Sequence, residues 1–531
     1  MRKRGEHGVL LLAVSFMLMF TLIAVNYYSI ADVQEYVSAA EQRSLLKVIA
    51  GESQGTIYDR NMKPLCNTVV RYQAVAVPRA LDREKTAVYA VNAEKFYEEY
   101  DKGEPFVFEC KADTPESDAL TVFEVPERYT GKETAQHVLG YLSDGSGVSG
   151  IEYAYDSVLR GENGENSVEY SVDGFGRVII GDGKTVVRSS ASKAGVVATI
   201  DKDIQSVCES CGSSIKKGAI VVSDVKTGDI LAMASFPSYR SDRIEEALLS
   251  PDSPLIDRCL YSYGVGSIFK LVTACEAIEE GRWDYRYDCK GSINVSGQNF
   301  NCHRLDGHGL QSMTRAMTNS CNTFFISLSS ELDMAGFRAK AHTLGFGSEN
   351  YLCSGLVGSA GVLPTSRELS VPAELANFSF GQGKLTATPL QINRLTCAIA
   401  GGGTMPHLRL IKGLTANGED VSREKTLLTE RVMEPRTAEL LRQMMIAAVR
   451  SNEDSNARSE KVELAAKTST AQTGRFDSSG EELCHAWITG FFPVSKPEYA
   501  LTVLYEDGGY GNQAAAPVFR EIAEKITETG K

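Results

Sequence analysis

The sequence predicts an α+β protein with a single N-terminal transmembrane helix, an extended mixed α/β module and a C-terminal domain made of an antiparallel sheet flanked by helices. Three observations carry this prediction: one long apolar run near the N-terminus, a small polar segment around residues 189–192 where the pattern changes, and strands at both ends of the last region with helices between them. We expect a tail at 1–8, a membrane anchor at 9–30, an N-terminal module at 31–193 and a C-terminal domain at 194–531.

The apolar run Val9–Val25, extended by Tyr27 and Tyr28, approaches the roughly 20 residues that span a bilayer core. Arg2–Arg4 precedes it, and no basic residue follows before Arg43. The positive-inside rule therefore places the N-terminus in the cytoplasm and the bulk of the chain outside. A cleaved signal peptide is the alternative, but its apolar region usually has only about 7–15 residues.

The region after the anchor mixes short strands with charged helices. Residues 31–48 have the polar-faced pattern of a helical stalk, 55–61 read as a strand and a turn, and 82–102 contain charged helices. Glycine clusters at 145–147 and 161–164 mark turns between these elements.

The last region has longer apolar runs. Five of them predict strands: 196–201, 219–224, 230–235, 485–491 and 499–505. The first leads into a helix at Ile204, the second and third are joined by the turn Lys226–Asp229, and a closing helix begins near Ala516. Strands from both ends of the domain indicate one sheet that is closed by the domain's own termini.

The composition narrows the class of protein. The formal net charge is −13, and 43% of the residues are apolar. These values fit a globular protein with a large core and argue against collagen-like, low-complexity or mainly disordered chains. A single long apolar run argues against a polytopic membrane protein, and an acidic chain without a long basic cluster is not expected to bind nucleic acid.

Twelve cysteines in 531 residues are too sparse for a disulfide scaffold. Cys208 and Cys211 form a CxxC pair, which we interpret as two positions on a helix because no second pair lies near. Cys289 and Cys302 flank a Gly-rich, hairpin-like stretch, and in an oxidising compartment a disulfide and two free thiols are both open.

His303 and His308 follow this hairpin and raise the question of a metal. Their spacing to Cys289 and Cys302 matches no zinc pattern well. The sequence therefore predicts no metal site.

Three short clusters in the last region are notable together. Ser267 and Lys270 open an apolar-periodic helix, where residues three apart share one face. A serine there has free N–H groups beside it, and a lysine acts as its base once burial or another cation lowers the lysine's pKa. Ser320 and Asn322 form a Ser-x-Asn element, and Lys467 begins a Lys-Thr-Ser-Thr strand. Each cluster alone is compatible with a helix cap, a turn or an edge strand. In this order they form the signature of penicillin-binding proteins and class A β-lactamases.

With these motifs the chain resembles a class B penicillin-binding protein, a membrane-anchored peptidoglycan D,D-transpeptidase, over nearly its whole length. Further segments are similar to elements of this family: 55–60, 150–161, 199–205, 224–237, 380–391 and 487–493. The resemblance implies a serine β-lactamase-like, penicillin-binding transpeptidase fold for 194–531. It implies a non-catalytic pedestal or dimerisation module for 31–193.

Four positions depart from the family's pattern. Gln54 occupies the place of an arginine, Met62 that of a glycine and Val265 that of a proline. Ser469 replaces the glycine of the Lys-Thr-Gly element, where glycine inside a strand often marks the close approach of another group. Because serine is small, we expect Ser469 to tune affinity for substrate or β-lactam rather than abolish activity.

The resemblance implies catalysis through a serine acyl-enzyme. Ser267 attacks the penultimate D-alanine of a stem peptide, terminal D-alanine leaves, and an amine of a neighbouring stem takes the acyl group. Lys270 takes the proton of Ser267, and Ser320 relays a proton to the leaving nitrogen. Asn322 holds the donor amide, and Lys467 supplies charge for the terminal carboxylate.

Substrate binding is assigned to Thr468, Ser469 and Thr470 by the same resemblance. The hydroxyls of Thr468 and Thr470 bind the carboxylate, and the backbone N–H groups of Ser267 and Thr470 form the oxyanion hole. No metal or cofactor is implied, and β-lactams are expected to acylate Ser267.

The partners implied are peptidoglycan stem peptides, β-lactam antibiotics, the cytoplasmic membrane through one helix, and a polytopic glycosyltransferase of the shape, elongation, division and sporulation family. Alternative readings are a class D-like β-lactamase, a D,D-carboxypeptidase, or a non-catalytic β-lactam sensor or scaffold in a wall-synthesis complex. The module between anchor and catalytic domain argues against a stand-alone hydrolase. The intact set of motif residues argues against a dead site.

Overall fold

The computed structural model describes residues 2–31, 45–161, 164–181, 183–189, 193–423 and 429–529. The chain forms two compact units, each built from three segments. Unit 1 contains Met1–Gln54, Val69–Glu127 and Glu162–Ser190, and unit 2 contains Gly55–Thr68, Arg128–Gly161 and Ala191–Lys531. The expected boundary at 193/194 cuts the chain once, whereas residues 55–68 and 128–161 belong to unit 2. One reason is strand pairing, since β2 (Thr56–Tyr58) pairs in parallel with β10 (Gly195–Ala198).

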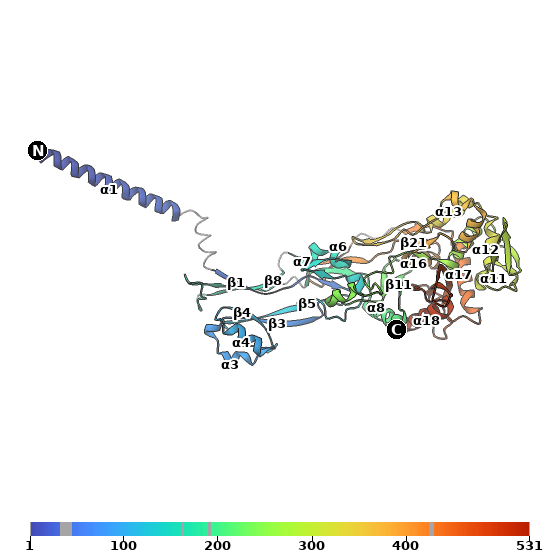
Figure 1. Ribbon diagram of the computed structural model, residues 1–531, viewed down its shortest axis with the longest axis horizontal. Coiled ribbons are helices and arrows are strands. Elements are labelled where there is room, and N and C mark those ends of the chain that lie inside the picture. Colours follow the sequence, from blue (N-terminus) through green and yellow to red (C-terminus); the bar gives the residue numbers. More distant parts are fainter. Residues whose placement is uncertain are drawn as a thin grey trace. The chain divides into compact units, whose positions relative to one another are not determined.

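The expected apolar helix is present as α1 (Arg2–Ala31), drawn in blue in Figure 1. Within it, His7–Ser29 is long and apolar enough to cross a membrane.

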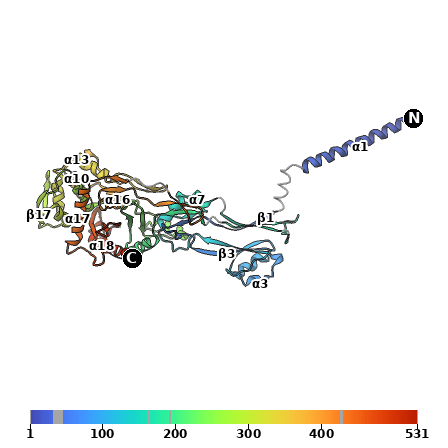
Figure 2. The ribbon, with the colours of Figure 1, turned by 180° about the vertical axis from the view of Figure 1, so that it is seen from behind.

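Unit 1 contains two three-stranded antiparallel sheets. One has the order β1-β8-β9, with β1 (Leu45–Glu52), β8 (Glu165–Ser171) and β9 (Lys184–Val187). The other has the order β4-β3-β5, with β3 (Val69–Ala76), β4 (Phe106–Cys110) and β5 (Leu120–Glu127). The short helices α3 (Arg83–Ala87) and α4 (Ala93–Tyr100) lie beside β3 and β4 (Figures 1 and 2), where Phe96 packs against Phe106 and Phe108.

The prediction of a helical stalk at 31–48 is wrong at its C-terminal end, because residues 45–48 begin strand β1. Residues 32–44 lie outside the described residues. Val48 and Ala50 alternate with more exposed neighbours and pack into a cluster with Val168 and Tyr170 of β8. This period of two is the pattern of a strand rather than of a helix.

Unit 2 is organised around a five-stranded antiparallel sheet of order β12-β11-β27-β26-β25. Its strands are β11 (Gly218–Asp224), β12 (Ile230–Phe236), β25 (Ala465–Phe476), β26 (Glu482–Phe492) and β27 (Tyr499–Tyr505). The prediction of one sheet closed by both ends of the domain is confirmed for four of the five predicted strands, because β11 pairs with β27. The first predicted strand, β10, pairs instead with β2 and β22 (Ile411–Thr415) in a separate sheet. The predicted turn between β11 and β12 is also present, with Gly228 at φ +73°.

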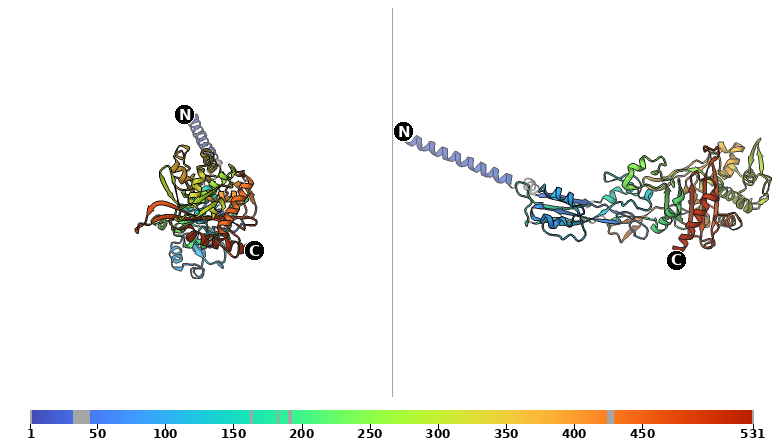
Figure 3. Two further views of the ribbon diagram at one scale, coloured as in Figure 1. Left: turned by 90° about the vertical axis from the view of Figure 1, so that its right-hand side faces the viewer. Right: turned by 60° about the horizontal axis from the view of Figure 1, so that its bottom comes forward.

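Helices cover both faces of this sheet. Alternate strand residues, such as Ile220 and Ile488, point toward α8 (Lys202–Cys211) and α18 (Gly511–Thr529). The residues between them, such as Val221 and Trp487, join the larger core with α16 (Pro389–Ala400). Figure 3 shows the red helix α18 lying along the sheet. Helix α8 begins before the expected Ile204, and α18 before the expected Ala516.

Smaller elements surround this framework. They are α5 (Gln136–Leu139), β6 (Leu142–Ser143), β7 (Ser146–Gly147), α6 (Gly150–Ala154), α7 (Asp156–Arg160), α9 (Ile244–Leu248), β13 (Tyr263–Gly264), α10 (Lys270–Glu279), β14 (Arg286–Cys289), β15 (Ser292–Val295), β16 (Gln298–Asn301), β17 (Gly309–Ser312), α11 (Met313–Thr318), α12 (Asn322–Ser329), α13 (Met334–Thr343), β18 (Asn350–Cys353), β19 (Leu356–Gly358), α14 (Ser366–Leu369), α15 (Pro372–Ser379), β20 (Thr386–Ala387), β21 (Thr404–Pro406), β22 (Ile411–Thr415), β23 (Val421–Arg423), β24 (Thr429–Arg431) and α17 (Pro435–Arg450).

The motif segments that precede the sheet hold unit 2 together. The buried Asp59 accepts backbone hydrogen bonds from Asn61 and Lys63 at 2.8 Å, and from Lys202 at 3.1 Å. Met62, at a position where the family has glycine, adopts φ +64°, a conformation that glycine adopts at lower cost.

Glu152 of the 150–161 segment lies in a buried ion pair. Its carboxylate accepts hydrogen bonds from Arg128 Nε at 2.8 Å and Nη2 at 2.7 Å, and from the Tyr129 hydroxyl at 2.6 Å. Arg128 also donates to the carbonyl of Gly55. The pair therefore ties two of the three segments of unit 2 to each other.

Candidate active site

Ser267 lies on a tight turn directly before helix α10. Residues Gly266–Phe269 form a single turn of 3-10 helix, and α10 continues from Lys270. Positions three apart are nearly eclipsed in a 3-10 turn, so the sequence expectation that Ser267 and Lys270 share a face holds for this backbone. Ser267 is half-buried and Lys270 is fully buried. Among the described residues, the Ser267 hydroxyl makes no hydrogen bond to a protein group.

Three consecutive residues before Ser267 are fixed by hydrogen bonds. Trp487 Nε1 donates to the carbonyl of Gly264 at 3.0 Å, and Ser469 Oγ donates to that of Val265 at 2.8 Å. The N–H of Gly266 donates to the carbonyl of Gly381 at 2.8 Å. These contacts come from β26, β25 and the segment after α15, so the turn is held from three sides.

Glycine is required at both residues of the hydrogen bond between Gly266 and Gly381. Gly266 has φ +60°, and a Cβ there would overlap Ser469 Oγ. A Cβ on Gly381 would overlap the carbonyl of Gly266. The family-like 380–383 segment thus serves to pack backbone against the turn that carries Ser267.

The Ser-x-Asn element forms the turn between α11 and α12. Ser320 has φ +49°, a left-handed conformation that is uncommon for residues other than glycine. Lys270 Nζ lies 2.7 Å from the Ser320 carbonyl, 3.2 Å from Ser320 Oγ and 2.7 Å from Asn322 Oδ1. Nζ donates to all three oxygens, which matches the three donors of a lysine side chain.

Lys467 lies on β25, an edge strand of the sheet, and completes the cluster. Its Nζ lies 3.2 Å from Ser320 Oγ and 2.7 Å from the carbonyl of Thr468. Ser320 Oγ is therefore shared by the two lysines. Lys270 is 50 residues and Lys467 is 147 residues away from Ser320 in the chain, and the three sequence motifs meet at this one hydroxyl.

Burial sets the electrostatics of the two lysines. Desolvation, followed by the charge of Lys467, lowers the pKa of Lys270 well below the usual lysine value. Desolvation lowers the pKa of Lys467 to about 7. The lowered pKa values of both lysines are consistent with the expectation that burial and a neighbouring cation make Lys270 a base.

The strand after Lys467 presents alternate side chains to two environments. Lys467 and Ser469 are buried on one face, and Thr468 and Thr470 are half-buried on the other. Thr470 Oγ1 accepts a hydrogen bond from the N–H of Gly511 at 3.1 Å, which leaves its own hydrogen available to a ligand. The assignment of Thr468 and Thr470 to carboxylate binding stays a prediction.

Ser469 Oγ donates to the Val265 carbonyl on the turn that carries Ser267, and replacing Ser469 measures the effect of that contact. We expect Ser469→Gly to change the second-order rate of β-lactam acylation by less than about tenfold, because a neutral hydrogen bond contributes only about 0.5–1.5 kcal/mol. The rate constant is measured with a chromogenic cephalosporin, with Ser469→Ala as the variant that keeps the strand's Cβ. A loss above a hundredfold in either variant contradicts a tuning role.

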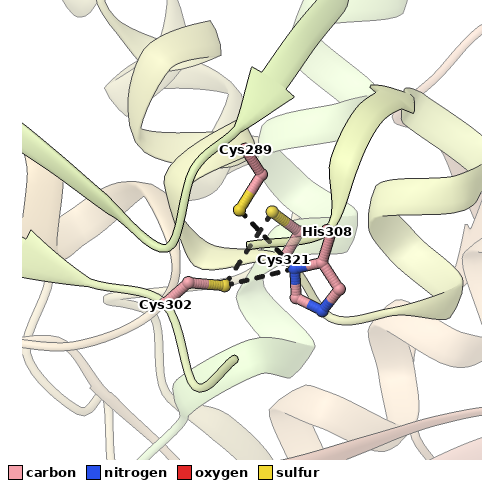
Figure 4. Close-up of side chains that lie close together, drawn as sticks. All are labelled: Cys289, Cys302, His308 and Cys321. Carbon is pink, nitrogen blue, oxygen red and sulfur yellow. Dashed lines mark hydrogen bonds between the residues drawn. The ribbon is translucent and has the colours of Figure 1, made fainter. Parts of the chain in front are cut away.

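One feature next to this site is not predicted by the sequence motifs. Cys321, the middle residue of Ser-x-Asn, lies in a cluster with Cys289, Cys302 and His308 (Figure 4). All twelve cysteines are free in the structure, including Cys289 and Cys302. The CxxC residues Cys208 and Cys211 lie on α8, which confirms the interpretation of this pair as two positions on a helix.

Comparisons with known proteins agree with this geometry. The family described as penicillin binding protein transpeptidase domain matches residues 218–524, more than half of the chain. The chain is 27% identical to stage V sporulation protein D of Bacillus subtilis (strain 168) over 74% of its own length and 62% of that protein's, so it spans less than two thirds of that relative. It is 24% identical to the peptidoglycan D,D-transpeptidase MrdA of Acinetobacter baumannii over 97% of this chain and 88% of that protein.

Solved structures share the fold. One of them, from work on the structural coordination of polymerization and crosslinking by a peptidoglycan synthase complex, matches 96% of both chains with a TM-score of 0.70 and 24% identity. The match of 218–524 includes the hairpin β11–β12, both lysines and Ser267, and MrdA aligns with nearly the whole chain. The chain therefore belongs to the penicillin-binding protein transpeptidases, and within them to class B.

Proposed function

We propose that the chain cross-links peptidoglycan stem peptides through an acyl-enzyme on Ser267, with release of terminal D-alanine. The observation that supports this most is the meeting of Lys270 and Lys467 at Ser320 Oγ, each at 3.2 Å. A single hydroxyl between two buried amines of lowered pKa is suited to move protons, whereas a scaffold has no chemical need for it.

In the acylation half, neutral Lys270 takes the proton of Ser267 as Oγ attacks the carbonyl of the penultimate D-alanine. The bond to the terminal D-alanine breaks, and its nitrogen receives a proton through Ser320. Lys467 holds the terminal carboxylate together with the hydroxyls of Thr468 and Thr470. The N–H groups of Ser267 and Thr470 stabilise the oxyanion, a contribution of about 10²–10³ in rate per donor.

In the transfer half, an amine of a neighbouring stem attacks the acyl-enzyme. Lys270 takes a proton from the attacking amine and passes it to Oγ as the ester bond to Ser267 breaks, and a new amide bond joins the two stems. Two successive acyl transfers conserve the energy of the original amide bond, so the reaction proceeds without ATP. β-Lactams acylate the same oxygen because their ring replaces the D-alanyl-D-alanine end.

The location and partners follow from the N-terminal helix. With α1 in the cytoplasmic membrane and its basic residues inside, the strands of unit 1 and the whole of unit 2 lie on the extracytoplasmic side. One structural relative, from work on polymerization and crosslinking by a peptidoglycan synthase complex, supports a partnership with wall-synthesis proteins. The resemblance to class B penicillin-binding proteins further implies a polytopic glycosyltransferase of the shape, elongation, division and sporulation family as the partner that supplies glycan strands.

The lowered pKa of Lys467 gives a pH prediction. The ammonium of Lys467 attracts the substrate's carboxylate, and this charge is lost as pH rises through about 7. The second-order acylation rate of a carboxylate-bearing β-lactam should therefore fall on the alkaline side of neutrality. In Lys467→Arg the guanidinium stays charged, so the fall should disappear even if the plateau is lower. A wild-type rate that is flat from about pH 6 to pH 9 contradicts this assignment.

Product analysis tests the proposed function. The full chain in detergent is incubated with a donor peptide ending in D-alanyl-D-alanine and an amine acceptor. Cross-linked product with release of D-alanine is expected. Hydrolysed donor alone supports the carboxypeptidase or β-lactamase reading, and no turnover together with no labelling by a fluorescent penicillin supports the sensor or scaffold.

A further inference from the structure

We propose that Cys289, Cys302, His308 and Cys321 bind one tetrahedral zinc ion beside the Ser-x-Asn turn. Figure 4 shows the three sulfurs and the imidazole directed toward a common centre. Their ligand atoms all lie within 4.8 Å of one another. They come from four places in the fold: the last residue of β14, the residue after β16, the residue before β17 and the N-cap of α12.

Three of the six distances between ligand atoms fit the edges of a zinc tetrahedron, and the other three are at most 4.8 Å. Zn–S bonds of about 2.3 Å and a Zn–N bond of about 2.05 Å give S···S edges of about 3.8 Å and S···N edges of about 3.5 Å. His308 Nδ1 lies 3.6 Å from Cys289 Sγ and 3.5 Å from Cys302 Sγ. Cys302 Sγ lies 3.9 Å from Cys321 Sγ. An ion at the centre of these atoms needs no large movement of its ligands.

The set of ligands favours a metal over a disulfide. A Cys289–Cys302 disulfide uses two of the sulfurs and leaves the Cys321 thiol and the His308 imidazole without a role. A tetrahedral ion uses all four. Three thiolates and one imidazole are typical of structural zinc sites, and the three sulfur-bearing residues are at most 2% exposed. On the oxidising side of the membrane, a bound ion also protects thiolates from pairing.

Hydrogen bonds from neighbouring groups hold the proposed ligands in place. Thr323 Oγ1 is fully buried, donates to Cys289 Sγ at 3.1 Å and lies 3.5 Å from Cys321 Sγ. Hydrogen bonds from such neighbouring groups orient the ligands of metal sites. The N–H of Cys302 donates to the carbonyl of Gly291 at 2.8 Å, which fixes the backbone at another ligand.

The site has a positioning role for catalysis. Cys321 lies between Ser320 and Asn322, whose oxygens hold Lys270 Nζ. An ion bound to Cys321 anchors the middle of this turn to three other points of the fold, and so keeps Ser320 in its left-handed conformation. The ion touches neither substrate nor Ser267; it sets the geometry of residues that do the proton transfer.

Metal content is the first measurement. The tag-free full chain, purified in detergent, is analysed by inductively coupled plasma mass spectrometry, and about one zinc per chain is expected for a single closed site. Cys302→Ala and His308→Asn should lose the ion. Two matched controls should keep it: His303→Asn removes the neighbouring exposed imidazole, and Cys211→Ala removes a buried thiol on α8.

Two measurements on wild type keep the proposal testable if a variant fails to fold. The cobalt-substituted chain should show thiolate-to-metal charge transfer and the intense visible bands of a tetrahedral site. Alkylation mapping without reductant should find Cys289, Cys302 and Cys321 protected until a chelator is added. A Cys289–Cys302 disulfide, or wild-type protein that stays free of metal after equilibration with zinc and dialysis, overturns the site.

Labelling by a fluorescent penicillin tests the positioning role, which rests on the proposed function. Loss of the ion in His308→Asn should slow labelling about tenfold or more, the usual scale for a group that orients a metal site or active site. Ser267→Ala should keep its zinc and lose all labelling. Zinc without labelling in wild type therefore refutes the proposed function alone, and full-rate labelling in a metal-free variant refutes the positioning role alone.

Discussion

Replacing Lys270 by methionine should slow β-lactam acylation of Ser267 by about 10²–10⁴-fold, the range that general-base catalysis contributes. Methionine is close to lysine in length but carries no base, and it cannot donate to the Ser320 carbonyl or to Asn322 Oδ1, both 2.7 Å from Nζ. The rate is measured as the second-order rate constant for labelling by a fluorescent penicillin. Ser267→Ala, which has no nucleophilic oxygen, sets the zero of the assay.

The Lys270 variant should remain folded, which separates lost chemistry from lost structure. Removing the amine leaves acceptors without a donor, at a cost of about 1–3 kcal/mol, but it also removes a buried ionisable group and its desolvation penalty. Lys340→Met is the matched control, since Lys340 lies on α13, which packs against α10, and is paired with Glu279 at 2.6 Å. Labelling of Lys270→Met at the wild-type rate would exclude Lys270 as the base.

The candidate catalytic residues could be selected from the sequence because their motifs are short and local. Ser267 and Lys270 are placed by one turn of helix, and Lys467 by the start of one strand. Their meeting at Ser320 Oγ depends on the pairing of β25 with the sheet and on the turn between α11 and α12. The order of the motifs in the chain indicates that the three segments lie together, although it does not give these contacts.

The Cys321 cluster could not be predicted in the same way. Its members come from three strand ends and a helix cap, so their spacing follows from the folded arrangement rather than from a local repeat. The spacing of His303 and His308 to Cys289 and Cys302 fits no zinc pattern, because the fourth ligand, Cys321, lies outside that stretch. The fourth ligand lies inside a motif that already had a catalytic interpretation.

The interleaving of the two units was also outside the reach of the sequence pattern. Residues 128–161 follow strands of unit 1 but belong to unit 2, and Arg128, which joins them to Gly55, lies in none of the recognised motifs. Residues 45–48 are predicted as the end of a helical stalk because the segment is too short for its pattern of apolar and polar residues to distinguish a helix from a strand. Pairing of β1 with β8, a contact more than 100 residues away in the chain, decides their conformation.

Breaking the Arg128–Glu152 pair should strongly destabilise unit 2. The Arg128 and Glu152 side chains are 13% and 1% exposed. Arg128→Met leaves the Glu152 carboxylate buried with only the Tyr129 hydroxyl, and removal of one partner of such a pair costs about 3–5 kcal/mol. Both tryptophans of the chain, Trp283 and Trp487, belong to unit 2, so chemical denaturation followed by tryptophan fluorescence reports on this unit.

A double replacement distinguishes a broken charge pair from lost packing. Arg128→Met with Glu152→Met removes both charges, and the free energy of unfolding should fall by less than the sum of the single losses, because neither variant group is then a buried, uncompensated ion. Lys63→Met is the control for an exposed pair, since Lys63 and Asp203 are 48% and 64% exposed and 2.7 Å apart, and it should cost no more than about 1 kcal/mol. Additive losses in the double variant would mean that Arg128 acts through its contact with Gly55 rather than through the charge of Glu152.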